Sequence, residues 1–148
     1  GAEASCMHFI AKACMAAKDY PAALTAAEGA RALVRQSEDI PREVGMIILV
    51  AQVSTFMIIE GAAGLNRASR SFFEGRGRDK VLRTAKEAVA LAATLGDPLL
   101  RAFAHHTLAR AYVSNGMLKA ALDETSVCVP MARKVGDTRC EGSTLLLV

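Results

Sequence analysis

Three stretches of the sequence repeat one pattern of small and large apolar residues, at intervals that agree with one another. Ala11 and Ala51 stand 40 residues apart, and Ala51 and Ala109 stand 58 apart, which is 18 more. Fixed spacing of this kind is the mark of a supersecondary unit that is copied along a chain. The sequence therefore predicts a unit of forty residues that occurs three times and is interrupted once.

The spacing inside each unit points to the same interruption. Ala23 follows Ala11 after twelve residues, and Ala121 follows Ala109 after twelve. In the middle unit the matching residue is Val81, which follows after thirty, again eighteen more than expected. Two independent intervals thus give one insertion of eighteen residues, in the second unit.

The signals between these positions are those of helices. Gly96-Asp97-Pro98 combines a helix stop, an N-cap and a proline suited to the first helical turn, and Gly136-Asp137 repeats the first two. Asp39-Ile40-Pro41 is a weaker version without the glycine. Apolar residues recur at i, i+3, i+4 and i+7, and no strand-like alternation appears. We expect helices over 3–17, 20–36, 41–58, 79–95, 98–114 and 118–135, and one that starts near 138.

Leu108, Ala109, Tyr112, Gly116 and Ala121 resemble the signature of the tetratricopeptide (TPR) repeat family. The resemblance implies an all-α, right-handed α-solenoid of about three and a half antiparallel helix hairpins, the second of which carries the 18-residue insertion. A unit of forty residues, against about 34 in the common TPR, implies longer helices, similar to kinesin-light-chain-like repeats. Because the chain is 52% hydrophobic and contains no Trp, we expect an aliphatic core.

The resemblance divides residues 1–148 as a single TPR-like domain. Repeat one covers 3–38, repeat two 39–96 with its insertion at about 59–78, repeat three 97–136, and a partial fourth repeat 137–148. Solenoids normally end on a helix with a polar outer face, whereas 145–148 is entirely apolar. We therefore expect a fragment of a longer array, or an end that a partner buries.

Two pairs of polar residues occupy equivalent places in repeats one and three. His8 and Lys12 form an i, i+4 pair, as do His106 and Arg110. In the resembling family this stripe of the first helix lines the concave groove, which implies a groove that binds proteins or peptides. Imidazole, ammonium and guanidinium groups there would favour acidic partners through charge-assisted hydrogen bonds. The alternative is a solvated polar face.

Nothing in the sequence predicts catalysis, a metal or a cofactor. His105 and His106 are adjacent on a helix and point about 100° apart, so they cannot share an ion. Paired carboxylates and an H-E-x-x-H motif are absent. The four cysteines form no C-x-x-C pair and match no zinc spacing, so we interpret them as buried or half-buried thiols in an intracellular, reducing compartment.

The insertion is strongly basic. Net charge over 67–83 is +4, whereas the whole chain carries +3, and Gly75 and Gly77 are expected to make part of the segment flexible. The residues expected to dock onto a partner are Arg67, Arg70, Phe72, Phe73, Arg76 and Arg78. The alternatives are contact with phosphate, nucleic acid or an anionic membrane, and a solvated loop whose phenylalanines pack on their own hairpin. Nucleic acid is disfavoured, because stacking on RNA would need more interleaved aromatic residues.

Residues 44–59 carry no charge and are apolar on all sides. At 1.5 Å per residue they span about 24 Å, less than the roughly 30 Å of a bilayer core, so we predict a central helix buried on both sides. Membrane insertion stays as the alternative if the helix continues through 61–65. The apolarity also suggests that a neighbour covers surface that the repeats leave open.

These observations favour a non-catalytic protein-protein interaction scaffold that binds a peptide or protein partner. One alternative is a structural accessory subunit of a large multiprotein assembly, including a membrane-bound one. The other is contact with nucleic acid or phosphate through the arginine-rich insertion.

Overall fold

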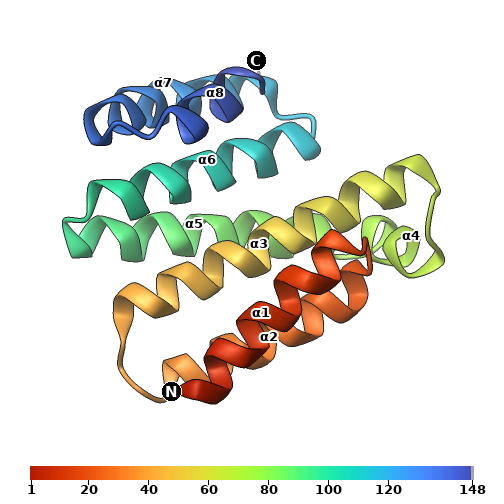
Figure 1. Ribbon diagram of the computed structural model, residues 1–148. Helices are drawn as coiled ribbons and strands as arrows, with labels where there is room; N and C mark the ends of the chain where they lie inside the picture. The colour runs from red at the N-terminus through yellow and green to blue at the C-terminus, as the bar shows by residue number, and fades with distance from the viewer. Residues whose placement is uncertain (148) are drawn as a thin grey trace.

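The computed structural model describes residues 1–147, which form eight α-helices and no strand. The all-α prediction is confirmed, and seven of the helices begin within two residues of their expected positions (Figure 1). The helix expected over 41–58 continues to Ala63. The helices are α1 (Ala2–Ala16), α2 (Tyr20–Arg35), α3 (Ile40–Ala63), α4 (Arg67–Glu74), α5 (Gly77–Leu95), α6 (Pro98–Ser114), α7 (Leu118–Val135) and α8 (Thr138–Leu145). The last residue of the expected fourth repeat, 148, lies outside the described residues.

Backbone turns between the helices repeat at the intervals found in the sequence. Glu38, Gly96 and Gly136 adopt left-handed conformations, with φ of 55°, 68° and 72°, and they are 58 and 40 residues apart. The aspartate that follows each of them accepts a hydrogen bond from a backbone N–H in the first turn of the next helix. The boundary that lacked a glycine therefore has the same geometry as the other two, with Glu38 in the left-handed position.

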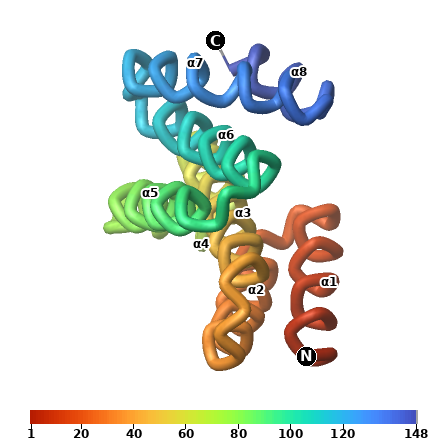
Figure 2. Tube along the Cα trace, turned by 90° about the vertical axis from the view of Figure 1, so that its left-hand side faces the viewer, coloured from red at the N-terminus to blue at the C-terminus, as the bar shows by residue number. Residues whose placement is uncertain are grey.

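Each helix packs against the next helix in the chain, with one exception at the insertion. There α3 packs against α5 as well as against α4, and α4 makes only a small contact with α5. In addition, α6 contacts both α3 and α8. Two ion pairs join α2 to α5, Arg31 to Glu87 at 2.6 Å and Lys80 to Glu28 at 2.5 Å. Figure 2 shows α1 and α8 at opposite ends of the molecule, with α3 and α6 between them.

Small residues fill the contacts between these helices. The three alanines that set the spacing, Ala11, Ala51 and Ala109, are fully buried. The matching residues on the second helix of each repeat are fully buried as well: Ala23, Val81 and Ala121. Because an alanine side chain ends at Cβ, helices that meet at alanines can approach closely. The alanine-rich composition thus explains how the helices pack closely around the larger side chains of α3.

The long helix α3 lies at the centre of the fold, where it contacts α2, α4, α5 and α6. It continues to Ala63 and is long and apolar enough to cross a membrane, with a mean hydropathy of 1.9. However, 72% of its most apolar window is buried by the other helices. The apolarity of 44–59 is therefore accounted for by packing within the chain, as expected for a central helix.

The insertion contains a helix, α4, that the sequence analysis did not predict, and it packs on α3. Gly61 of α3 lies so close to α4 that an added Cβ would be 2.3 Å from the Ser69 carbonyl oxygen. Gly77 is buried, and a Cβ there would lie 2.4 Å from the Phe72 carbonyl oxygen. Glycine at these two positions permits close packing rather than motion. The sequence reasoning had weighed only the backbone freedom of glycine.

Candidate functional site

The predicted groove residues lie on α1 and α6, and α3 is the first helix of the repeat between them. Lys12, Gln52 and Arg110 each follow one of the three buried alanines, on these three helices. Lys12 is exposed, whereas Gln52 and Arg110 are half-buried. The ammonium, amide and guanidinium groups can all donate hydrogen bonds. Hydrogen-bond donors therefore occupy the equivalent position on all three helices. These three residues are named the donor row after their matching positions, and Gln52 is a member that the sequence analysis missed.

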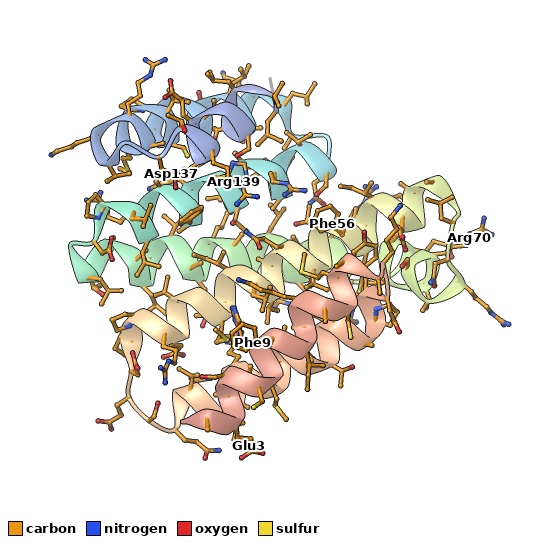
Figure 3. The ribbon with its side chains drawn as sticks, viewed as in Figure 1. Glu3, Phe9, Phe56, Arg70, Asp137 and Arg139 are labelled. Atoms are coloured by element: carbon orange, nitrogen blue, oxygen red, sulfur yellow. The ribbon has the colours of Figure 1, made fainter. Side chains whose placement is uncertain are left out.

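Arg110 is the most distinctive member of this donor row. Its guanidinium carbon lies 4.6 Å from the centroid of the Phe56 ring on α3. Phe56 in turn stacks on Tyr20, at the start of α2, with ring centroids 5.5 Å apart and planes 6° apart. A stack of one guanidinium and two rings therefore joins α6, α3 and α2 (Figure 3 labels Phe56 where α3 passes α6). No motif or spacing in the sequence indicates that these three residues meet.

The charge of Arg110 has no carboxylate partner within residues 1–147. Burial lowers the pKa of Arg110, because a half-buried guanidinium has lost part of its hydration. The negative face of the Phe56 ring attracts the guanidinium and so compensates in part for this lost hydration. An incoming carboxylate would supply the missing counter-charge and a planar, two-point hydrogen-bonding partner.

Acidic groups are scarce around the row. The sequence of α6 contains no Asp or Glu, and α3 carries its two glutamates near its ends, at Glu43 and Glu60. Glu60 accepts a hydrogen bond from Ser69 of α4 at 3.3 Å. On α1 the only acidic residue is Glu3, in the first turn. The middle of α3 is uncharged, and Lys12 of α1 and Arg110 of α6 have no acidic residue near them on their own helices.

His106 is buried, which corrects the expectation that it lines an open groove. Only 7% of the residue is exposed, and its Nδ1 lies 2.8 Å from the hydroxyl of Thr144 on α8. Burial, followed by the nearby charge of Arg110, lowers the pKa of His106 to about 4. The imidazole is thus neutral at pH 7 and joins α6 to α8, so Arg110 carries the charge of this pair.

His8 borders a pocket of about 240 Å³ between α1, α2 and α3, which Arg42 and Met46 also line. Its Nδ1 is buried and has no hydrogen-bond partner within residues 1–147. Burial, followed by the charge of Lys12, lowers the pKa of His8. Like His106, this imidazole therefore adds a polar group rather than a positive charge at pH 7.

The residues of the insertion divide into a packed part and an exposed part. Phe72 and Phe73 are half-buried against the core, which supports the alternative that they pack on their own hairpin. Arg78 lies over the Phe73 ring at 4.2 Å. Arg67, Arg70 and Arg76 are exposed, and Figure 3 shows Arg70 pointing away from the body of the molecule. Of the six predicted docking residues, only these three arginines are exposed.

Among the described residues, no three His, Cys, Asp or Glu side chains are grouped so that they could hold a metal ion. His105 pairs with Glu124 of α7 at 2.7 Å, whereas His106 points to α8, so the two histidines serve different contacts, as expected. All four cysteines are free. Cys128 and Cys140 are buried and Cys14 is half-buried, but Cys6 is exposed, which corrects the expectation for that thiol.

No family model, curated protein or solved structure matches this chain. A function for it therefore has to be inferred from its own residues.

Proposed function

We propose that the chain is a right-handed, TPR-like α-solenoid that acts as a non-catalytic scaffold and binds an acidic segment of a partner protein. Its hairpins would be α1–α2, α3–α5 with α4 inserted, and α6–α7, and α8 would begin a fourth. Support comes from the intervals of 40 and 58 residues, which occur both in the buried alanines and in the left-handed turns. The order in which the helices pack agrees with this arrangement.

The observation that carries the binding proposal is Arg110, half-buried over Phe56 with no carboxylate beside it. A desolvated, unpaired charge is costly, and a ligand that pairs with it recovers part of that cost. Hydrogen bonds to charged groups are worth about 1.5–3 kcal/mol. We therefore expect a carboxylate of the partner to bind at Arg110.

The surroundings of Arg110 define the ligand further. Lys12 and Gln52 stand at the equivalent positions on α1 and α3, so an extended segment that crosses these helices would meet donors on each one. Half-buried Phe56 offers apolar surface next to the guanidinium. The expected ligand is a peptide with an Asp or Glu next to an apolar residue and a second polar or acidic group further along.

Selection of peptides from a random displayed library against the full chain tests this function. We expect the selected peptides to be enriched in Asp and Glu, and Arg110→Ala to weaken their binding roughly ten-fold or more. Arg110→Lys keeps the charge but loses the planar fork, so its affinity should lie in between. Arg83→Ala is the charge-matched control, because Arg83 is an exposed residue of α5. Peptides without acidic bias, or equal effects of Arg110→Ala and Arg83→Ala, would contradict the proposal.

A further inference from the structure

We propose that the pocket beside His8 binds a small carboxylic acid with a short apolar chain or ring, whose carboxylate pairs with Arg42 and His8. This inference goes beyond the proposed peptide-binding function. It depends on the contact between α1 and α3 and not on the donor row.

Three equivalent places in the fold can be compared, because the repeat intervals of 40 and 58 residues align them. Each lies where the first helix of one repeat meets the first helix of the next, which gives α1 with α3, α3 with α6, and α6 with α8. The corresponding residues are His8, Arg42 and Met46 in the first place, Ile48, Leu100 and Ala104 in the second, and His106, Cys140 and Thr144 in the third.

The second and third places are filled by side chains. In the second, the three corresponding residues belong to one apolar cluster. In the third, Cys140 and Thr144 are buried, and the Thr144 hydroxyl lies 2.8 Å from Nδ1 of His106. Phe103 packs against the apolar clusters on either side. The polar atom of the histidine is therefore satisfied there, and no large space is left.

The first place is open. Ser5 stands where the third place has Phe103, so a large side chain is missing. Met46 stands where the third place has Thr144, and a thioether sulfur is only a weak hydrogen-bond acceptor. The backbones of α1 and α3 also stay further apart than those of α3 and α6, and Figure 2 shows α1 standing away from α3. The pocket of about 240 Å³ lies at this place.

The open place belongs to the contact between repeats one and two. His8 lies on the side of α1 that faces α2 and α3, the helices that follow it, since residues of both line the pocket with it. Ile48, which corresponds to His8, is covered in the same way by residues of α5 and α6. The helices that fill the other two places are thus present at the first place, but their side chains leave it open.

Two groups in the pocket lack a good partner of their own. Nδ1 of His8 is buried and has no hydrogen-bond partner within residues 1–147. The one ion pair of Arg42 among these residues is long, with 3.7 Å between its Nε and a carboxylate oxygen of Asp39. A carboxylate can accept a hydrogen bond from Nδ1 of the neutral imidazole and pair with the guanidinium at the same time.

The remaining lining limits the rest of the ligand. Apart from the hydroxyl of Ser5, it is apolar and consists of Ala4, Phe9, Val34 and Met46. Ligand sites of this kind combine an apolar wall with a few polar groups that fix orientation. Because a water molecule takes about 30 Å³ of liquid, the pocket has room for about eight waters, or for a ligand with roughly that number of non-hydrogen atoms. Hexanoate and benzoate have this size and chemistry.

NMR spectra of the full chain, labelled at its methionine methyl groups and titrated with hexanoate or benzoate, test the site. We expect the Met46 signal to shift, with a dissociation constant on the order of 1 mM, and the signal of exposed Met117 to stay in place. Hexanamide lacks the charge and acetate lacks the chain, so each should bind about ten-fold more weakly than hexanoate. An unchanged Met46 signal, or equal binding of hexanamide or acetate, would overturn the proposal.

Variants measured by titration calorimetry locate the two parts of the site. Arg42→Met removes the charge but keeps an unbranched side chain, and it should weaken hexanoate binding ten-fold or more. Arg67→Met is the charge-matched control, because Arg67 is exposed on α4 and should bind hexanoate as the unaltered chain does. Equal effects of the two changes would contradict a role for Arg42.

Ser5→Phe gives the first place the large residue that the third place has, so it should fill the pocket and abolish hexanoate binding. Undiminished binding in this variant would place the ligand elsewhere and overturn the proposal. Arg110→Ala, which is expected to weaken peptide binding, should leave hexanoate binding unchanged. The pocket and the donor row can therefore fail or succeed independently.

Discussion

The imidazole of His106 and the hydroxyl of Thr144 lie 2.8 Å apart and fasten α8 to α6. Thr144 donates its own proton to the Cys140 carbonyl at 2.7 Å, so its oxygen accepts from the protonated Nδ1 of His106. The thiol of Cys128 lies 3.4 Å from the same hydroxyl. Three helices therefore meet at one buried threonine, and the contact requires a proton on Nδ1 of His106.

Acid should destabilise the fold at His106 between about pH 6.5 and pH 4, because the charged imidazole would be buried and close to Arg110. The pKa of His106 is about 4 in the fold against 6.5 ordinarily, so the unfolded chain takes up the proton first. The free energy of unfolding therefore falls as the pH is lowered through this window. Below about pH 4 the stabilising contribution of the neutral His106 is lost. Across this window the shift lowers the free energy of unfolding by an amount on the order of 3 kcal/mol.

Urea unfolding of the chain and of His106→Asn, at several pH values, measures this contribution. The asparagine amide can replace the Nδ1 donor but does not titrate, so the slope across the window should be much smaller in the variant. A residual slope is expected from His8, whose pKa is also lowered. Identical slopes in the two proteins would show that His106 does not carry the acid sensitivity.

Two glycines of α3 should respond in opposite ways to alanine. In Gly61→Ala the new Cβ would lie 2.3 Å from the Ser69 carbonyl oxygen and 2.4 Å from Phe73 Cβ, so α4 must move and we expect a loss of about 2–4 kcal/mol. At Gly45 nothing lies within 4 Å of the new Cβ. Gly45→Ala should therefore gain about 0.5–1 kcal/mol from helix propensity. Thermal unfolding of both variants checks the contrast, and two changes of the same sign would argue against the packing of α4 on α3.

The order of the insertion can be measured directly by amide hydrogen exchange. We expect protection of the amides of α4 that follow its first turn, from Arg70 onward, because the Arg70 N–H donates to the Asn66 carbonyl and Asn66 caps the helix. Exchange at the rate of an unstructured peptide throughout 67–74 would contradict a folded insertion. The protected amides of α5 serve as the internal reference.

The four thiols should differ sharply in reactivity. Burial, with Cys128 next in effect, raises the pKa of the Cys140 thiol to about 12, so almost no thiolate forms there at neutral pH. Cys6 is exposed. Alkylation of the folded chain, followed by mass spectrometry, should modify Cys6 first and Cys140 only after unfolding. Rapid labelling of Cys140 in the folded state would mean that α8 is not docked as described.

The sequence predicted the helices well because their boundaries depend on local chemistry. Gly96 and Gly136 adopt the left-handed conformation expected of them, and the aspartates after them cap the next helices. Glu38 was missed because nothing in a glutamate signals a left-handed residue; its place becomes clear only from the intervals to Gly96 and Gly136. The insertion was misinterpreted for a related reason, since close approach at Gly61 depends on a tertiary contact.

The candidate site could be predicted only in part. Helical spacing pairs Lys12 with His8 and Arg110 with His106, but it cannot tell that α8 covers His106 while Arg110 stays accessible. The contact of Arg110 with Phe56 joins residues 54 positions apart in the sequence, and the stack with Tyr20 adds a third helix. Such contacts depend on how the repeats stack, which a single sequence does not specify.

The position of a bound acidic peptide tests the central claim most directly. Chemical-shift mapping of the isotope-labelled chain, titrated with a peptide selected as above, identifies the residues that contact it. The account predicts that the largest changes occur in α1, α3 and α6, around Lys12, Gln52 and Arg110, and that they disappear in Arg110→Ala. Changes centred on α4 or on the exposed end of α7, and unaltered by Arg110→Ala, would contradict it.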